Sequence, residues 1–524
     1  MDPRPGPPAE LWSLREDVHV ETAAGGSLIV HSRWGEVLLP SAGAVEHEAL
    51  RRMSLGPILL ENVVSEPDAR DSLLTGLLER LDHLIVRSFG LEPDQLLLSV
   101  VPLTRQAGLR PVPLDHDLPV RMSRFTMLRG DGNDYLMESP LSLHRVVLHR
   151  AEAFWALSSL ARPVTPARAQ AALPTPGSPL ERLFPQLLST LVAAGMAVQA
   201  ETADPLVFGE DRDSALALWS PIDLMFHTRA TIGRHDHDFG ATYPLGERSF
   251  VEPVVKQPAS RPGIALYRPL WADLVANDPP LTATVEGTDR PQGACPPTVE
   301  ELGELLYRAI RVRSLVGDPA VPAATSERPY QSLGDRYELE IYVTAGACSG
   351  LPRGCYHYDP AGHLLEPLEV SEADVSELLG NGGLAAGLPD PPPVLLTVTA
   401  RFGRIHWRYE GPGYALIHKN VGSVLQLLGM VSTAMGLPEC SHHCSDIEAA
   451  SRIFGTDWRV ESSVGEFIIG SRPKPEASRV RTPVNDAAWS DLAGSLLSRK
   501  NSVRSSVQYD AGPIRSPKVG RSRH

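Results

Sequence analysis

The segment "RPYQSLGDRYELEIYV" (328–343) combines a turn that could contact a ligand with a strand that would hold the turn in place. Ser332 offers a hydroxyl group, and Gly334 has no side chain to cover the neighbouring backbone amides. An apolar strand is expected at 339–343, and an aromatic segment, "YHYD" (356–359), follows it. Donors with little side-chain bulk suit the polar edge of a flat ligand. The turn is therefore the first candidate binding site.

Two other segments contain residue types that bind metals. "HDHD" (235–238) offers imidazoles and carboxylates, and "CSHHC" (440–444) offers two thiols and two imidazoles. The first lies in a polar stretch typical of a solvated loop, and the second is too short for all four groups to reach one ion comfortably. We therefore predict no metal site.

Several common catalytic signatures are missing. No P-loop lysine, HExxH helix or nucleophile elbow occurs, and "GNGGLAAG" (380–387) is interpreted as part of a Gly/Pro-rich loop and not as a phosphate-binding fingerprint.

Composition narrows the class of protein. The chain has 524 residues, 42% hydrophobic and 21% charged, which is enough for two to four domains with buried cores. Its five cysteines do not form a disulfide framework. No apolar run reaches the ~18 residues of a membrane span, and the first residues lack a signal-peptide pattern, so we expect a cytoplasmic protein that does not bind membranes.

The charge is unevenly distributed. The net charge is −14, yet residues 473–524 contain ten Lys and Arg against four Asp and Glu. The rest of the chain is thus more acidic than the total suggests, which argues against nucleic-acid binding. Residues 473–524 are rich in Ser, Arg and Pro, and we predict a disordered basic tail.

Periodicity predicts an α+β protein. Strands and helices are expected at 13–40 (short antiparallel strands), 45–53 and 69–88 (helices), 121–149 (three strands), and 151–160 and 180–195 (helices). This order suits two winged-helix-like modules, 1–112 and 113–205, without a catalytic constellation, the second of them a peptide-recognition module. Residues 206–472 alternate further strands and helices, including a buried strand at 394–400 and a long apolar helix at 421–435.

The C-terminal half resembles the SagB/ThcOx-type (McbC-like) azoline dehydrogenases, which are flavoproteins of the nitroreductase superfamily. The resemblance covers about 265 residues and rests on six blocks in the same order: "WSPIDLMFHTRATIGRHD", "RPYQSLGDRYELEIYV", "GCYHYDP", "ARFGRIHWRYEGPGYAL", "NVGSVLQLLGMVSTAMGL" and "SSVGEFIIGS". It implies a nitroreductase-like flavin domain at 206–472. The winged-helix-like modules also resemble the peptide-recognition regions that often precede such a domain.

The resemblance implies a function and a set of partners. Members of the family use FMN to oxidise thiazolines or oxazolines to thiazoles or oxazoles on a ribosomally made precursor peptide. A cyclodehydratase complex forms the heterocycles beforehand. The partners implied are the precursor peptide, with its leader and azoline core, that complex, and a second subunit in a homodimer or a heterodimer.

The resemblance also assigns roles to five residues. Arg229 matches the arginine that binds the FMN phosphate, and Ser332 and Gly334 match the turn that contacts the flavin. Arg408 and Tyr409 stand where the family has a Lys-Tyr pair that removes a proton from the azoline. An arginine stays protonated, so Tyr409 is the candidate base and Arg408 would stabilise its phenolate.

Several positions depart from the family pattern. Ala230 and Thr231 replace the end of an Arg-Ser-Arg motif, and Leu333 and Asp335 alter a Ser-Gly-Gly-Ala turn. A Gly-rich loop reads "SHHC" at 441–444. These changes keep two alternatives open: a flavin-poor, non-catalytic paralogue that serves as a scaffold or partner subunit, and a general nitro- or quinone reductase.

Overall fold

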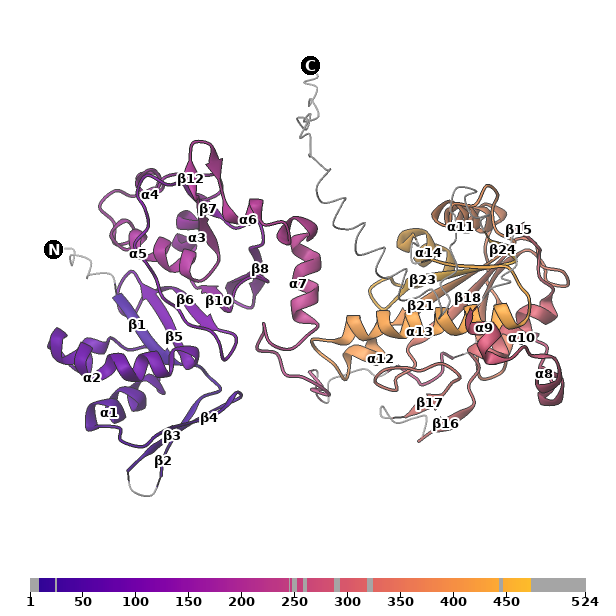
Figure 1. Cartoon of the computed structure of the whole chain (residues 1–524), viewed down its shortest axis with the longest axis horizontal. Coiled ribbons are helices and arrows are strands. Elements are labelled where there is room, and N and C mark those ends of the chain that lie inside the picture. Colours follow the sequence, from indigo (N-terminus) through magenta and orange to yellow (C-terminus); the bar gives the residue numbers. More distant parts are fainter. Residues whose placement is uncertain are drawn as a thin grey trace, which may run out of the picture.

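The computed structural model describes residues 9–23, 26–244, 246, 252–257, 262–286, 293–317, 324–442 and 446–472. An N-terminal part and a C-terminal part are joined through helix α7 (Pro221–Arg229) (Figure 1). The tail expected at 473–524 lies outside the described residues. No helix in the described ranges is long and apolar enough to cross a bilayer.

The N-terminal part is built on a six-stranded antiparallel sheet with the order β1-β5-β6-β10-β9-β8. Its strands are β1 (Ala9–Leu14), β5 (Ile85–Gly90), β6 (Leu96–Pro102), β8 (Met127–Asp131), β9 (Asp134–Glu138) and β10 (His144–Leu148). A three-stranded sheet pairs β2 (His19–Thr22), β3 (Leu28–Ser32) and β4 (Gly35–Leu39). Small two-stranded sheets pair β7 (Val120–Met122) with β11 (Ala197–Gln199), and β12 (Thr202–Ala203) with β13 (Leu206–Val207).

Two hydrophobic clusters support this sheet. The first packs α1 (Ala44–Met53) and α2 (Pro67–Arg80) against the early strands. The second packs α3 (Ala151–Ser158), α4 (Pro166–Ala171) and α5 (Pro179–Ala193) against the later strands. Strands from both predicted modules therefore share one sheet, and a boundary near residue 112 would cross it. The short helix α6 (Gly209–Arg212) precedes α7.

Two predicted elements of this part were wrong in extent. The helix expected at 69–88 ends at Arg80, and residues 85–90 form β5 between β1 and β6. Pairing with two neighbouring strands outweighs the helical spacing of the leucines. Residues 120–148 hold four strands where three were expected. The additional strand, β7, lies outside the large sheet and pairs with β11.

The C-terminal part is an α+β unit around a seven-stranded antiparallel sheet with the order β14-β20-β19-β18-β21-β23-β22. Its strands are β14 (Ile264–Ala265), β18 (Leu339–Ala345), β19 (Gly354–Asp359), β20 (Leu364–Pro367), β21 (Val394–Arg401), β22 (Glu439–His442) and β23 (Glu461–Ile469). Smaller pairs are β15 (Gly293–Ala294) with β24 (Ser471–Arg472), and β16 (Ser314–Val316) with β17 (Thr325–Glu327).

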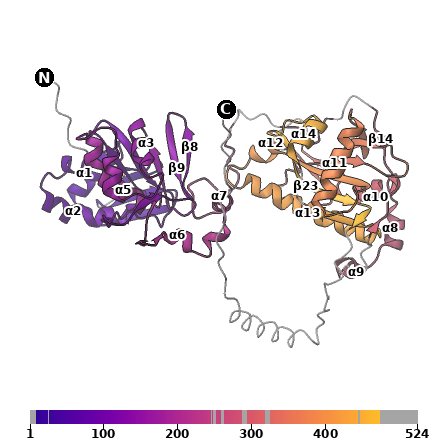
Figure 2. The ribbon, with the colours of Figure 1, turned by 90° about the horizontal axis from the view of Figure 1, so that it is seen from above.

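Helices cover both faces of this sheet. The side chains of α10 (Val299–Ala309) and α13 (Gly413–Ala434) share the main core with β18 and β21, whereas α11 (Glu372–Ala385) and α14 (Ile447–Phe454) pack on the opposite face. Figure 2 shows these helices around the sheet from above. The remaining helices are α8 (Trp271–Asn277), α9 (Leu281–Glu286) and α12 (Phe402–His406). The long helix begins at Gly413, eight residues before its predicted start.

Candidate active site

The turn between 331 and 337, singled out from the sequence, has an unusual backbone. Gly334, Asp335 and Tyr337 have φ angles of 88°, 55° and 48°. Aspartate tolerates this left-handed region, but tyrosine rarely adopts it. The surrounding structure must therefore hold the turn in place.

Asn420 of α13 provides this support. Its side chain is fully buried, accepts a hydrogen bond from the Leu333 amide at 2.6 Å and donates one to a Glu338 carboxylate oxygen at 2.9 Å. Ser332 is also buried, and its Oγ accepts a hydrogen bond from the Tyr337 amide at 3.2 Å. The Ser332 hydroxyl thus braces the turn from inside.

Gly334 lies directly against Tyr409. A Cβ atom on Gly334 would be 2.9 Å from the Tyr409 ring and 3.0 Å from its hydroxyl oxygen. Both the φ angle and the close contact require glycine at this position. The structure therefore brings together Gly334 and Tyr409, which are 75 positions apart in the sequence.

Two guanidinium groups meet at the same turn. Arg336 Nε and Arg408 Nη1 donate to the Gly334 carbonyl oxygen at 3.2 and 3.3 Å. Neither arginine forms an ion pair with a carboxylate in the described part of the chain, and Arg408 Nε is buried without a hydrogen-bond partner there. Burial, and then the charge of Arg408, lowers the pKa of Arg336. Two guanidinium groups without a carboxylate partner, one of them with an Nε–H that makes no hydrogen bond in the described structure, form a place for an anionic group.

Arg229 lies near this site, but its side chain is engaged elsewhere. It is the last residue of α7, and its carbonyl oxygen would be 3.3 Å from a Cβ atom on Gly411. Its guanidinium contacts the Glu138 carboxylate and the His237 ring. The structure thus places Arg229 next to the segment that follows Tyr409, with its charge directed toward β9.

The two segments with metal-binding residue types have other contacts. Asp236 lies 3.1 Å from Arg145 and 3.4 Å from Arg15, while His237 lies 3.2 Å from Glu410. Cys440 and His442 are part of β22, and Cys444 lies outside the described residues.

Sequence reasoning missed Arg336 and Asn420. Asn420 was visible as a polar residue at the start of a long apolar run, which is a signal for a buried polar contact. Arg336 lies two residues after Gly334, but only the fold shows that its guanidinium returns to the Gly334 carbonyl.

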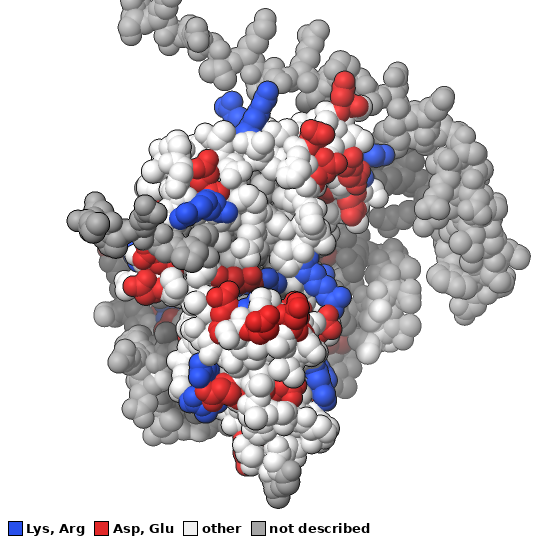
Figure 3. Space-filling model, turned by 90° about the vertical axis from the view of Figure 1, so that its left-hand side faces the viewer, with Lys and Arg blue, Asp and Glu red and all other residues white. Residues whose placement is uncertain are grey.

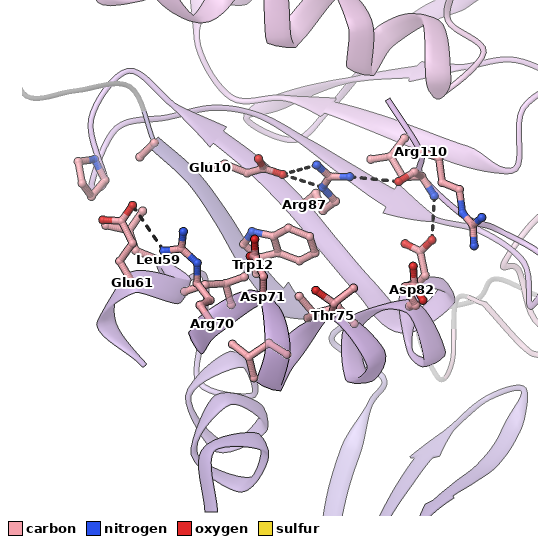
Figure 4. Close-up of a pocket in the computed structure, with 17 residues that line it drawn as sticks. Glu10, Trp12, Leu59, Glu61, Arg70, Asp71, Thr75, Asp82, Arg87 and Arg110 are labelled. Carbon is pink, nitrogen blue, oxygen red and sulfur yellow. Dashed lines mark hydrogen bonds and ion pairs between the residues drawn. The ribbon is translucent and has the colours of Figure 1, made fainter. Parts of the chain in front are cut away.

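A cavity of about 640 Å³ lies in the N-terminal part, between α2 and β1. Figure 4 shows Trp12 at its centre, with the Arg87–Glu10 and Arg70–Glu61 ion pairs on its walls. On the outer edge of β1, Trp12 forms a single antiparallel bridge with Ile58. On the face of the N-terminal part in Figure 3, acidic side chains gather in groups with basic ones between them. The cavity is lined by both apolar and charged side chains, and it forms a groove beside β1.

Comparison with known proteins finds sequence similarity over parts of the chain. The sequence model described as Cyanobactin oxidase ThcOx matches residues 120–236, a range that includes Arg229. A putative nitroreductase of Methanocaldococcus jannaschii is 29% identical over 142 residues, which are 27% of this chain and 66% of that protein. The chain is thus similar to a ThcOx oxidase and to a nitroreductase over parts of its length. It spans slightly less than two thirds of that relative's length.

Similar solved structures include a putative nitroreductase and a chain of a larger complex. A putative nitroreductase of Ralstonia eutropha is 18% identical, with a TM-score of 0.31, and the match covers 43% of this chain and 97% of that one. A chain of the Escherichia coli microcin synthetase McbBCD complex with truncated pro-MccB17 bound is 19% identical, with a TM-score of 0.30 and coverages of 48% and 92%.

Proposed function

We propose that this ThcOx-like protein is an FMN-dependent dehydrogenase that oxidises thiazolines or oxazolines on a precursor peptide. The observation that carries the proposal is the pair of guanidiniums, Arg336 and Arg408, at the Gly334 carbonyl, without a carboxylate partner in the described residues and beside Tyr409. An anionic cofactor would satisfy both charges.

The residues present fit such a cofactor. The buried, unpartnered Arg408 Nε and the Arg336 guanidinium would hold the phosphate or another electron-rich part of FMN. Ser332 would brace the turn from inside, and Gly334 would let the Tyr409 ring pack against the turn beside the flavin. Arg229 remains a predicted phosphate ligand, which must leave Glu138 to take that role. When bound, FMN would accept the hydride equivalent that leaves the azoline.

The chain itself must remove the accompanying proton. Tyr409 carries the hydroxyl nearest to Gly334, and the Arg408 guanidinium lies 5.4 Å from the centre of its ring. In the proposed reaction, Tyr409 takes the proton from the acidic ring carbon as the heterocycle becomes aromatic. Arg408 would then lie beside the negative charge that forms on Tyr409.

The test is oxidation of an azoline-containing peptide, followed as the loss of two hydrogen atoms by mass spectrometry. Replacing Arg336 and Arg408 with glutamine should weaken FMN binding by about tenfold or more, the scale of a lost charge-assisted hydrogen bond. Arg459→Gln changes an exposed arginine of the same part and is the matched control. FMN affinity that is equal in the double variant and in the control would refute the assignment.

We propose further that the N-terminal part binds the leader of the precursor peptide in the cavity between α2 and β1. An extended peptide could lie along this groove, with its apolar side chains against Trp12 and Leu78. Leu78 lines the cavity, whereas Leu73 lies on the same helix, is exposed and does not line it.

Leu78→Asp should therefore weaken binding of a labelled precursor peptide, measured by fluorescence anisotropy, and Leu73→Asp should leave it unchanged. Equal affinities for both variants would place the leader elsewhere. A partner cyclodehydratase complex would bring the peptide to this surface with its azolines already formed.

A further inference from the structure

A second group of side chains in the N-terminal part has the arrangement of a hydrolytic triad. Ser99 Oγ lies 2.8 Å from His149 Nε2, and His149 Nδ1 lies 3.2 Å from an Asp134 carboxylate oxygen. Ser99 is on β6, Asp134 begins β9, and His149 directly follows β10, which pairs with both strands. Serine, imidazole and carboxylate thus form a chain across three neighbouring segments of one sheet, the order of roles that activates a serine nucleophile.

The hydrogen bonds fix the direction of proton transfer along this chain. An ionised Asp134 can only accept, so His149 carries its proton on Nδ1 and leaves Nε2 as the acceptor. Ser99 then donates its proton to Nε2. The Ser88 hydroxyl, 2.7 Å from Ser99 Oγ, donates to the oxygen of Ser99. Ser99 is therefore the hydroxyl group with a base placed to receive its proton.

These residues face a cavity and are not enclosed in the core. Ser99, His149 and Asp134 all line a cavity of about 780 Å³ on this face of the sheet. Ser99 lies deep in it, with 7% of its surface exposed, while the His149 and Asp134 side chains are 24% and 40% exposed. A small molecule that enters the cavity can thus meet both the hydroxyl and the base.

The rest of the cavity wall indicates the class of substrate. Valines supply an apolar strip on this face of the sheet. The wall also holds three arginines and, besides Asp134, three carboxylates: Val86, Val101, Val147, Arg15, Arg33, Arg145, Glu16, Asp17 and Asp236. Arg15 and Arg145 share the carboxylate of Asp236. An apolar strip in a wall whose positive and negative charges nearly balance suits a short, uncharged acyl group.

We propose that Ser99, His149 and Asp134 form a second catalytic site, which hydrolyses short carboxylic esters. Ser99 Oγ forms a bond to the carbonyl carbon while its proton moves to His149 Nε2. The bond to the leaving oxygen breaks, and His149 returns the proton to that oxygen. Water then forms a bond to the acyl carbon and gives one proton to His149. The bond between the acyl carbon and Ser99 Oγ breaks, and His149 returns the proton to Oγ, which releases the acid and free Ser99. The steps need no oxidant or reductant, and they are independent of the flavin site.

The experiment uses the full-length protein with two probes. A fluorophosphonate should label the protein, with the added mass located on Ser99 by peptide mapping, and p-nitrophenyl acetate should be hydrolysed. Ser99→Ala should abolish labelling at this position. His149→Gln and Asp134→Asn should each slow labelling and hydrolysis by about 10²-fold or more, the scale of a lost general base or its orienting partner.

Ser13→Ala is the matched control, since Ser13 lines the same cavity on β1 but has no imidazole bonded to its hydroxyl in the described structure. It should label and hydrolyse like the wild type. Thermal unfolding of each variant shows whether it is folded. If Ser99→Ala did not fold, the mapped label on the wild type and the effect of Asp134→Asn, whose side chain is well exposed, would decide. No label on Ser99, or equal rates in the Asp134→Asn variant and the wild type, would overturn the proposal.

Discussion

At the scale of single residues, the candidate active site rests on the contact between Gly334 and Tyr409. The ring covers the side of Gly334 where a Cβ atom would be, and the phenol hydroxyl lies over the turn. Any larger residue at 334 would displace the ring. Tyr409, the proposed base, can occupy this position because Gly334 has no side chain.

Changing Tyr409→Phe keeps this packing and removes only the hydroxyl. We expect the rate of azoline oxidation to fall by about 10²-fold or more, with FMN still bound, because the proton acceptor is lost. Tyr414→Phe, an exposed tyrosine at the start of α13, is the control and should turn over normally. Normal turnover by Tyr409→Phe would remove Tyr409 from the chemistry.

Glu466 predicts a pH dependence of stability. Burial raises the pKa of this β23 carboxyl group to about 8, with His442 Nε2 3.5 Å away. A carboxyl group with a raised folded-state pKa binds more protons when folded, so its contribution to stability is full at low pH and is lost as the pH rises through about 8.

Relative to the wild type, Glu466→Gln should therefore raise the melting temperature more at a pH above about 8 than at a pH of about 5. Thermal unfolding across this range checks the expectation. Glu372→Gln, on the exposed first turn of α11, should leave the pH profile unchanged. Parallel profiles for the wild type and Glu466→Gln would contradict the assignment.

Sequence reasoning could select residues here but not their contacts. Ser332, Gly334, Arg408 and Tyr409 were chosen by resemblance, and the structure places all four at one turn. The direction of the Arg229 side chain was not predictable, because Glu138 comes from a strand far away in the sequence. The Ser99–His149–Asp134 chain also depends on strand pairing, which no local spacing reveals.

At the scale of elements, α13 is the support of the site. It begins after the Tyr409 segment, and one face of it carries apolar residues into the main core with Asn420 among them. Asn420 connects the helix to the turn through Leu333 and Glu338. The helix therefore determines the shape of the turn.

Asn420→Ala should leave the Leu333 amide and a Glu338 oxygen buried without their partner. The expected cost is about 1–3 kcal/mol of the free energy of unfolding for each unsatisfied group, seen in denaturant titration. FMN affinity should fall as well, since the turn loses its brace. Ser423→Ala, on the exposed side of the same helix, should cost little. A fully stable Asn420→Ala variant would show that the turn holds itself.

Patterns predicted elements well where burial is one-sided, and less well elsewhere. In α10, Thr298 caps the first turn, and the amphipathic run after it buries one face of the helix. The segment "GNGGLAAG", interpreted as a loop, is instead largely part of α11, whose first turn is capped by Ser371. Gly382 there lies against Leu395 of β21, so the glycine serves close helix–sheet packing, which the sequence alone does not show.

At the scale of the whole molecule, α13 predicts a subunit interface. Gly422 and Gln426 lie on its exposed side, next to partly exposed apolar residues, Leu425 and Leu427. We expect this face to pair with a second copy of the chain or with a related subunit, since an apolar helix gains stability when both sides are covered.

Gly422→Glu tests this expectation, because a Cβ atom at Gly422 meets no atom within 4 Å in the single chain. The change should convert dimers to monomers, measured by light scattering, without lowering the melting temperature of the monomer. Gly380→Glu in α11, where a Cβ atom also meets nothing within 4 Å, should remain dimeric. A wild type that is monomeric with FMN bound would refute the interface.

The central claim, the proposal that this chain works as a flavin enzyme, is tested most directly by the flavin content of the purified full-length protein. The chain is saturated with FMN and desalted, and its visible absorption and the FMN released on denaturation are then measured. Our account predicts a yellow protein with close to one FMN per chain, and a marked loss of FMN in the Arg336→Gln, Arg408→Gln variant. A colourless wild type that retains no FMN under these conditions would contradict the account and favour the non-catalytic scaffold.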